Sequence, residues 1–118
     1  MRRETEPVAQ RQLTKDEKRQ ARELATLARE AELVEALEEL HALFSDWRKG
    51  RIDAFQLSDA IHQFHDGQAR DLFKMYNGLR PEDLAARAIA HELVPPAEIP
   101  RDLRRALGER IERWRRRE

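Results

Sequence analysis

The chain has 118 residues, of which 39% are charged, and its 23 Lys and Arg residues balance 23 Asp and Glu residues. It contains no Cys, and its mean hydropathy is -0.87. These values exclude a membrane-spanning helix, a disulfide framework and a Cys-based zinc module. A net charge of zero also excludes a general electrostatic attraction to nucleic acids or membrane surfaces.

Charge is distributed unevenly along the chain. Residues 1–49 carry a net charge of -1, residues 50–100 carry -3 and residues 101–118 carry +4, so the basic surplus is confined to the C-terminal end. Ala, Leu, Glu and Arg, which are all strong helix formers, dominate the composition. The excess of Arg over Lys, 19 to 4, indicates a GC-rich bacterial genome because Arg codons are rich in G and C.

The N-terminal part of the chain predicts a polar, flexible arm over residues 1–13 and a long, highly charged helix over residues 14–49. Thr14 and Glu17 have the spacing of a capping box, and Gly50 is the first stop signal. The second half of this helix has a heptad-like apolar stripe that is expected to pack on the core: Leu33, Leu37, Leu40, Phe44 and Trp47. The first half has a thinner stripe that is expected to project from the body: Leu24, Leu27, Ala28 and Ala31.

Residues 50–118 predict a compact helical domain made of short helices. Asp53 caps a helix that is expected to stop at Gly67, and a further helix is expected over Gln68 to Tyr76. The inward faces of these two helices are predicted to include Phe55, Leu57, Ala60, Ile61, Phe64, Leu72 and Phe73. Pro81 and Pro100 open two more helices, and Gly108 weakens or bends the last one. The whole chain is therefore predicted to be all-α, with four to five helices in the compact domain and a long N-terminal helix.

The long helix predicts a protein-interaction function. Its outer face is basic early and acidic later, so an antiparallel pairing of two copies would place the basic half of one against the acidic half of the other. We expect a non-enzymatic cytoplasmic adaptor or regulator that binds another protein, or itself as a homodimer, through Leu24, Leu27, Ala28 and Ala31. Ser45 and Ser58 lie in no nucleophile motif, and no Gly-rich phosphate loop is present, so no catalytic residues, cofactor or membrane contact is predicted.

Two alternative functions remain open from the sequence. Arg113, Arg115, Arg116 and Arg117 surround Trp114 and have the composition of a nucleic-acid contact, in which Arg pairs with phosphate and Trp stacks on a base. A second alternative is a His/carboxylate metal site, because Zn and Fe accept such ligands and helical spacing places several of them on one ridge. Its weak candidate ligands are Asp59, His62, His65 and Asp66.

Overall fold

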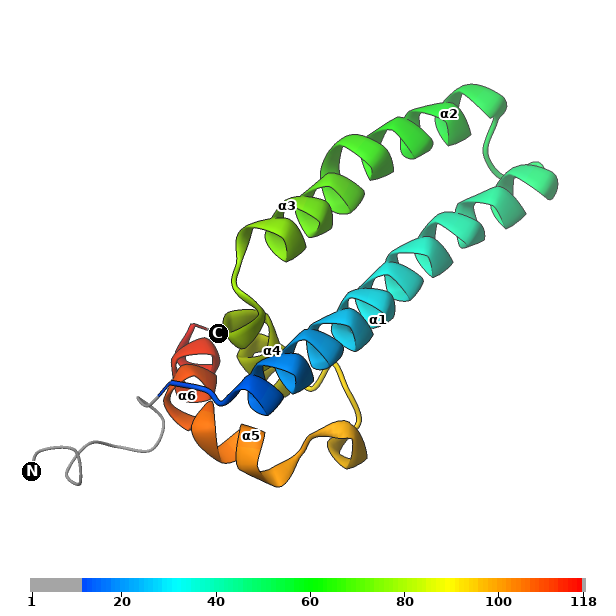
Figure 1. The fold of residues 1–118 in the computed structure, drawn as a ribbon. Helices are drawn as coiled ribbons and strands as arrows, with labels where there is room; N and C mark the ends of the chain where they lie inside the picture. Colours follow the sequence, from blue (N-terminus) through cyan, green and yellow to red (C-terminus); the bar gives the residue numbers. More distant parts are fainter. Residues whose placement is uncertain (1–11, 118) are drawn as a thin grey trace, which may run out of the picture. The chain divides into compact units, whose positions relative to one another are not determined.

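The computed structural model describes residues 12–117, and within this range the chain is helical and contains no strand (Figure 1). This confirms the predicted all-α fold with a long N-terminal helix. Residues 1–11, which make up most of the predicted arm, lie outside the described residues. The elements are α1 (Lys15–Arg48), α2 (Ala54–Gln63), the π-helical turn η3 (Phe64–Ala69), α3 (Arg70–Gly78), α4 (Pro81–Ala90), the 3-10 turn η4 (Pro96–Glu98), α5 (Arg101–Ala106) and α6 (Gly108–Arg116).

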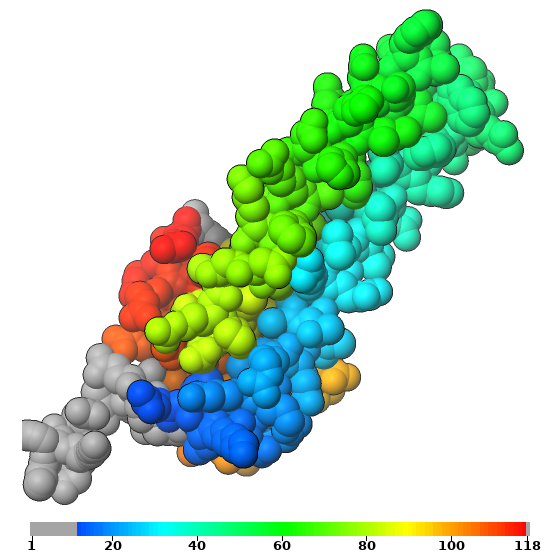
Figure 2. Space-filling model, turned by 45° about the horizontal axis from the view of Figure 1, so that its top comes forward, coloured from blue at the N-terminus to red at the C-terminus, as the bar shows by residue number. Residues whose placement is uncertain are grey.

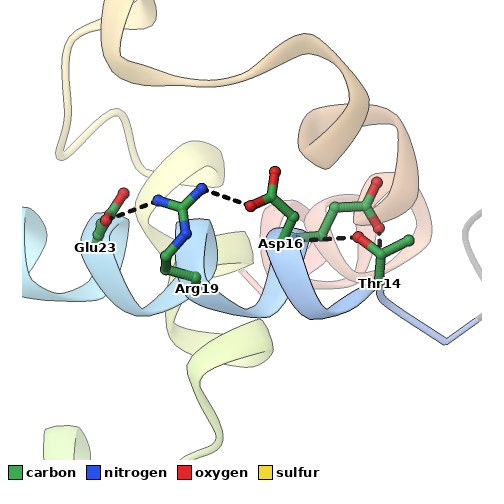
Figure 3. A network of polar contacts seen from close by, with 5 residues as sticks. Thr14, Asp16, Arg19 and Glu23 are labelled. Atoms are coloured by element: carbon green, nitrogen blue, oxygen red, sulfur yellow. Dashed lines mark hydrogen bonds and ion pairs between the residues drawn. The ribbon is translucent and has the colours of Figure 1, made fainter.

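The first turn of α1 is held by the predicted capping box. The Glu17 amide donates to the Thr14 hydroxyl at 3.1 Å, and the Thr14 amide donates to the Glu17 carboxylate at 3.0 Å. Beside it, Arg19 donates to Asp16 at 2.6 Å and to Glu23 at 3.0 Å (Figure 3). These hydrogen bonds, that to Asp16 foremost, raise the pKa of the Arg19 guanidinium. Because all three side chains are largely exposed, the pairs contribute little to stability and serve mainly to reinforce the helix.

The far end of α1 also follows the sequence signal. Gly50 adopts a φ of +77, the Arg51 amide donates to the Asp46 carbonyl at 2.8 Å, and the Gly50 amide donates to the Trp47 carbonyl at 3.0 Å. This pair of bonds is a Schellman motif, which satisfies the last carbonyls of the helix and favours Gly at the left-handed position.

The chain divides into two compact units. We call the first the terminal unit, which joins the chain up to Ala28 to the segment from Leu79 onward; the second, residues 29–78, is the hairpin unit. The helix α1 contributes its first half to the terminal unit and its second half to the hairpin unit. The first boundary between the units therefore falls inside the long helix, between Ala28 and Arg29. By sequence the terminal unit carries a net charge of +4 and the hairpin unit -4.

The terminal unit contains most of the buried apolar side chains. They come from the first half of α1 and the chain just before it, from α4, α5 and α6, and from the connections after α4 and between α5 and α6: Leu13, Ala21, Leu24, Ala25, Ala28, Leu84, Ala85, Ala86, Ala88, Ile89, Val94, Leu103, Ala106, Leu107 and Ile111. The expectation that the first half of α1 projects from the body is therefore wrong. Three of the buried side chains on this half of α1 are Ala21, Ala25 and Ala28, whose short side chains allow neighbouring backbones to approach closely.

The last helical segment breaks where Gly108 predicted a weakness. α5 ends at Ala106, Leu107 has a φ of -93 and a ψ of 4, and α6 begins at Gly108. α6 packs against α4 as well as α5. Asp83 of α4 and Arg110 of α6 form an ion pair at 3.3 Å, so the break redirects α6 into a position where it packs on α4.

In the hairpin unit, the second half of α1 runs antiparallel to α2, η3 and α3, and the two arms lie side by side (Figures 1 and 2). The Tyr76 hydroxyl donates to the Glu32 carboxylate at 2.6 Å, and the Arg29 guanidinium lies 5.8 Å from the centroid of the Tyr76 ring. The predicted stop at Gly67 is wrong, because the chain continues through a π-helical turn from α2 into α3. Gly67 has no positive φ, so it does not act as a left-handed cap.

Gly50 and Gly67 are expected to respond oppositely to replacement by Ala. No atom lies within 4 Å of a Cβ built at either position, but only Gly50 has a positive φ. Gly67→Ala should raise the free energy of unfolding by about 0.5–1 kcal/mol, because Ala loses less conformational entropy in a helix. Gly50→Ala should lower it by about 1–2 kcal/mol, because a Cβ strains the left-handed backbone. Urea unfolding followed by circular dichroism measures both changes, and a stabilising Gly50→Ala would contradict this assignment.

Candidate interaction site

The predicted contact stripe on the first half of α1 is divided by the fold. Leu24 is 2% exposed and Ala28 is 0% exposed, whereas Leu27 is 41% exposed and Ala31 is also exposed. Leu24 and Ala28 belong to the core of the terminal unit, so they cannot also form a free docking surface. The structure thus corrects the prediction for these two residues, because the helix presents to its own fold the side that was expected to meet a partner.

Exposed large apolar side chains are concentrated in the hairpin unit instead. Two such residues, Leu27 and Leu79, lie in the terminal unit, and the others lie in the hairpin unit: Val34, Leu37, Phe44, Trp47, Phe55, Ile61 and Phe73. In contrast, the buried apolar residues of the hairpin unit are Ala36, Leu57 and Tyr76. A contiguous exposed apolar surface on a small protein commonly marks an interaction site, so the arrangement of these residues on the hairpin is informative.

Helix geometry sorts the hairpin residues onto two faces. Successive residues are about 100° apart around a helix, and the two arms run in opposite directions. On both arms, the residue immediately after an inward-facing residue therefore points to the same face of the hairpin. The residue immediately before an inward-facing residue points to the opposite face. The inward-facing apolar residues are all buried or half-buried: Leu33, Ala36, Leu40, Leu43, Leu57, Ala60, Phe64 and Leu72.

The face formed by the following residues, here called the apolar face, carries no carboxylate between Val34 and Phe44 on α1 or between Ser58 and Phe73 on the other arm. Glu30, which follows the half-buried Arg29, lies at the end of this face. The other members of the face are all exposed: Val34, Leu37, His41, Phe44, Ser58, Ile61, His65 and Phe73. The exposed fractions of its largest side chains are 49% for Leu37, 38% for Phe44, 39% for Ile61 and 59% for Phe73. The inward-facing residues form a narrow apolar seam between the two arms. The large side chains of the apolar face widen this seam on one side of the hairpin only.

The opposite face, here called the acidic face, holds the preceding residues: Glu32, Glu35, Glu39, Ala42, Gln56, Asp59, Gln63 and Asp71. A groove of about 220 Å³ opens on it between the two arms. Apolar side chains of the seam line this groove together with Glu39, Gln63 and Gln68: Ala36, Leu40, Leu43, Ala60 and Phe64. No member of the apolar face lines it, which agrees with the assignment of the two faces from helix geometry.

These faces were not expected from the sequence, because the predicted core stripes included Leu37, Phe44, Ile61 and Phe73. Phe55, also predicted to face inward, is 83% exposed. A usable signal was nevertheless present in the apolar doublets Ala36-Leu37, Leu43-Phe44, Ala60-Ile61 and Leu72-Phe73. Two adjacent apolar residues make a stripe wider than a single neighbouring helix covers, so the second residue of each doublet remains exposed.

The candidate metal ligands do not converge. Asp59 and His62 are exposed on α2, and the exposed side chains of His65 and Asp66 form a pair at 3.3 Å on η3. Asp59 lies on the acidic face and His65 on the apolar face. Across residues 12–117, no group of three or more His, Asp and Glu side chains is placed to hold a metal ion.

The structure places three of the four C-terminal arginines around one hollow and the fourth at another. Arg113, Arg116 and Arg117 line a hollow of about 420 Å³ with Trp114, Leu79 and Asp83, and the Arg117 guanidinium lies 4.6 Å from the Trp114 ring centroid. Arg115 pairs with Glu112 at 2.8 Å and lines a different hollow. Trp114 itself is half-buried, edge-on to His91 with 6.1 Å between ring centroids, so part of this aromatic surface is used within the terminal unit.

Comparisons with models of known protein families, with curated protein sequences and with solved structures found no match to this chain. Between residues 12 and 117, no helix is both long enough and apolar enough to cross a membrane.

Proposed function

We propose that this protein is a non-enzymatic, cytoplasmic interaction module that self-associates through the apolar face of its hairpin unit. The observation that carries the proposal is the placement of Leu37, Phe44, Ile61 and Phe73 together on one face, each between 38% and 59% exposed. Glu30 is the carboxylate that the same helix geometry places at the end of this face. Enzymes need converging reactive groups, whereas this face offers apolar area, which is the chemistry of association.

A second copy of the chain is the occupant that suits this face best. In a two-fold symmetric contact, the same residues meet from both sides, so the part of the face that carries no carboxylate, beyond Glu30, meets no like charge. Five of the ten carboxylates of the hairpin unit lie on the acidic face, which stays in water in such a contact. This arrangement differs from the antiparallel pairing expected from the sequence, in which the first half of α1 would have met its partner's second half.

The expected dimer is reversible. Full burial of a large apolar side chain contributes about 1.5–3 kcal/mol, and the four main side chains of each copy are about half exposed, so each has roughly half of this to gain. The sum over two copies is comparable with the cost of about 4–15 kcal/mol for bringing two molecules together. Association should therefore depend on concentration rather than be permanent. A reversible dimer whose acidic face remains accessible fits a small adaptor or regulator.

Sedimentation velocity over a range of protein concentrations tests this proposal. The wild-type protein should shift from monomer to dimer, and Phe73→Asp should raise the dimer dissociation constant at least tenfold, because it buries a charge in the contact. Gln63→Asp is the matched control: it introduces the same carboxylate on the same hairpin but on the acidic face, and should leave the dimer unchanged.

Circular dichroism of both variants establishes that the helices are retained. A wild-type protein that remains monomeric at every concentration would overturn the proposal. Equal weakening by Phe73→Asp and Gln63→Asp would also overturn it, because the effect would then follow net charge rather than the apolar face.

A further inference from the structure

We propose that the groove on the acidic face binds a basic amphipathic helical segment of another protein. The groove lies on the opposite face of the hairpin from the proposed dimer contact, so this second site does not depend on self-association. Its floor is apolar and comes from both arms: Ala36, Leu40, Leu43, Ala60 and Phe64. A groove of this kind accepts one or two apolar side chains from a helix laid along it.

The rim of the groove specifies the charge of the occupant. On the α1 side, Glu39 lines the groove, and Glu35 lies one helical turn before it on the same stripe. On the other arm, Gln63 lines the groove, and Asp59 lies one turn before it. In the bound helix, Lys or Arg residues on each side of its apolar stripe would meet the carboxylates of the rim. The apolar stripe of that helix would contact the floor of the groove.

The surrounding charges strengthen this specificity. The hairpin unit contains 6 basic and 10 acidic residues, and the exposed Lys74 and Arg70 follow the end of the groove-lining segment rather than line it. An acidic helix would be repelled by the carboxylates of the rim. A neutral helix would leave these carboxylates without a compensating charge. The groove therefore discriminates by charge as well as by shape, which is how electrostatic complementarity selects partners.

The probe for this site is a synthetic, fluorescein-labelled amphipathic helix of Leu and Lys, compared with its Leu and Glu counterpart by fluorescence anisotropy. The Leu/Lys peptide should bind, with an affinity that falls as salt is raised, and the Leu/Glu peptide should not. Glu39→Lys should raise the dissociation constant at least tenfold. Glu38→Lys makes the same change in net charge at the neighbouring position, which turns away from the groove, and should have little effect.

The same titration with Phe73→Asp separates this site from the dimer contact. Unchanged peptide binding by Phe73→Asp supports the groove, whether or not the protein dimerises. Three results would each overturn the proposal: no binding of the Leu/Lys peptide by the wild-type protein, equal weakening by Glu38→Lys and Glu39→Lys, or loss of binding in Phe73→Asp but not in Glu39→Lys. The last result would place the peptide on the apolar face and would leave the groove without a function.

Discussion

Replacing Leu24 with Ala is expected to lower the free energy of unfolding by about 2–5 kcal/mol. Leu24 is 2% exposed and is among the largest fully buried side chains of the chain. It lies among Ala21, Ala25 and Ala28, whose short side chains have little freedom to move into the cavity that the substitution would leave. The loss combines the transfer free energy of the missing methyl groups with the cost of the cavity.

Leu27 provides the matched control on the same helix. It carries the same side chain three residues later but is 41% exposed, so Leu27→Ala should cost about 1 kcal/mol or less. Urea unfolding followed by circular dichroism, at one fixed protein concentration, measures both variants. If the two substitutions cost the same, the first half of α1 would not be packed as described, and the stripe expected from the sequence would be an open surface.

Tyr76→Phe is expected to cost about 1.5–3 kcal/mol, because it removes a hydrogen bond to a charged acceptor. The Tyr76 hydroxyl donates to Glu32 at 2.6 Å across 44 residues of sequence, and the Tyr76 side chain is 9% exposed. The bond joins the two arms of the hairpin near the start of the unit, where few buried apolar side chains hold the arms together.

A double-mutant cycle with Glu32→Gln isolates this contact from the other effects of each substitution. The coupling between the two changes should be about 0.5–3 kcal/mol, the range for residues in direct contact. Additive costs in Tyr76→Phe, Glu32→Gln and the double variant would show that the bond does not contribute to stability, and that the hairpin is held by its apolar seam alone.

Local signals predicted the helix ends well. Thr14 with Glu17, Asp53 with Gln56, Gly50, Pro81 and the weakness at Gly108 each act within one helical turn, and the structure has each of them in the predicted role. Gly67 is the exception. Its stop signal depends on a left-handed backbone, but Gly67 has no positive φ, and one π-helical turn carries the chain past it.

The two halves of α1 were harder to judge from sequence. The first half looked too poor in large apolar residues to be buried, yet Ala21, Ala25 and Ala28 are in the core. The second half looked like a core stripe, yet Leu37 and Phe44 are exposed. Periodicity shows which residues share a side of a helix, but burial depends on what the fold places against that side.

The sequence by itself determined that this chain is helical, where most of its helices begin and end, and that its charges are balanced overall but separated along the chain. These properties depend on backbone propensity, capping and composition, all of which act locally. Only the tertiary structure decided which apolar residues form the core and which remain on the surface. The reason is that an apolar doublet such as Leu72-Phe73 is wider than one neighbouring helix can cover, and only the packed hairpin determines which member of the pair remains exposed.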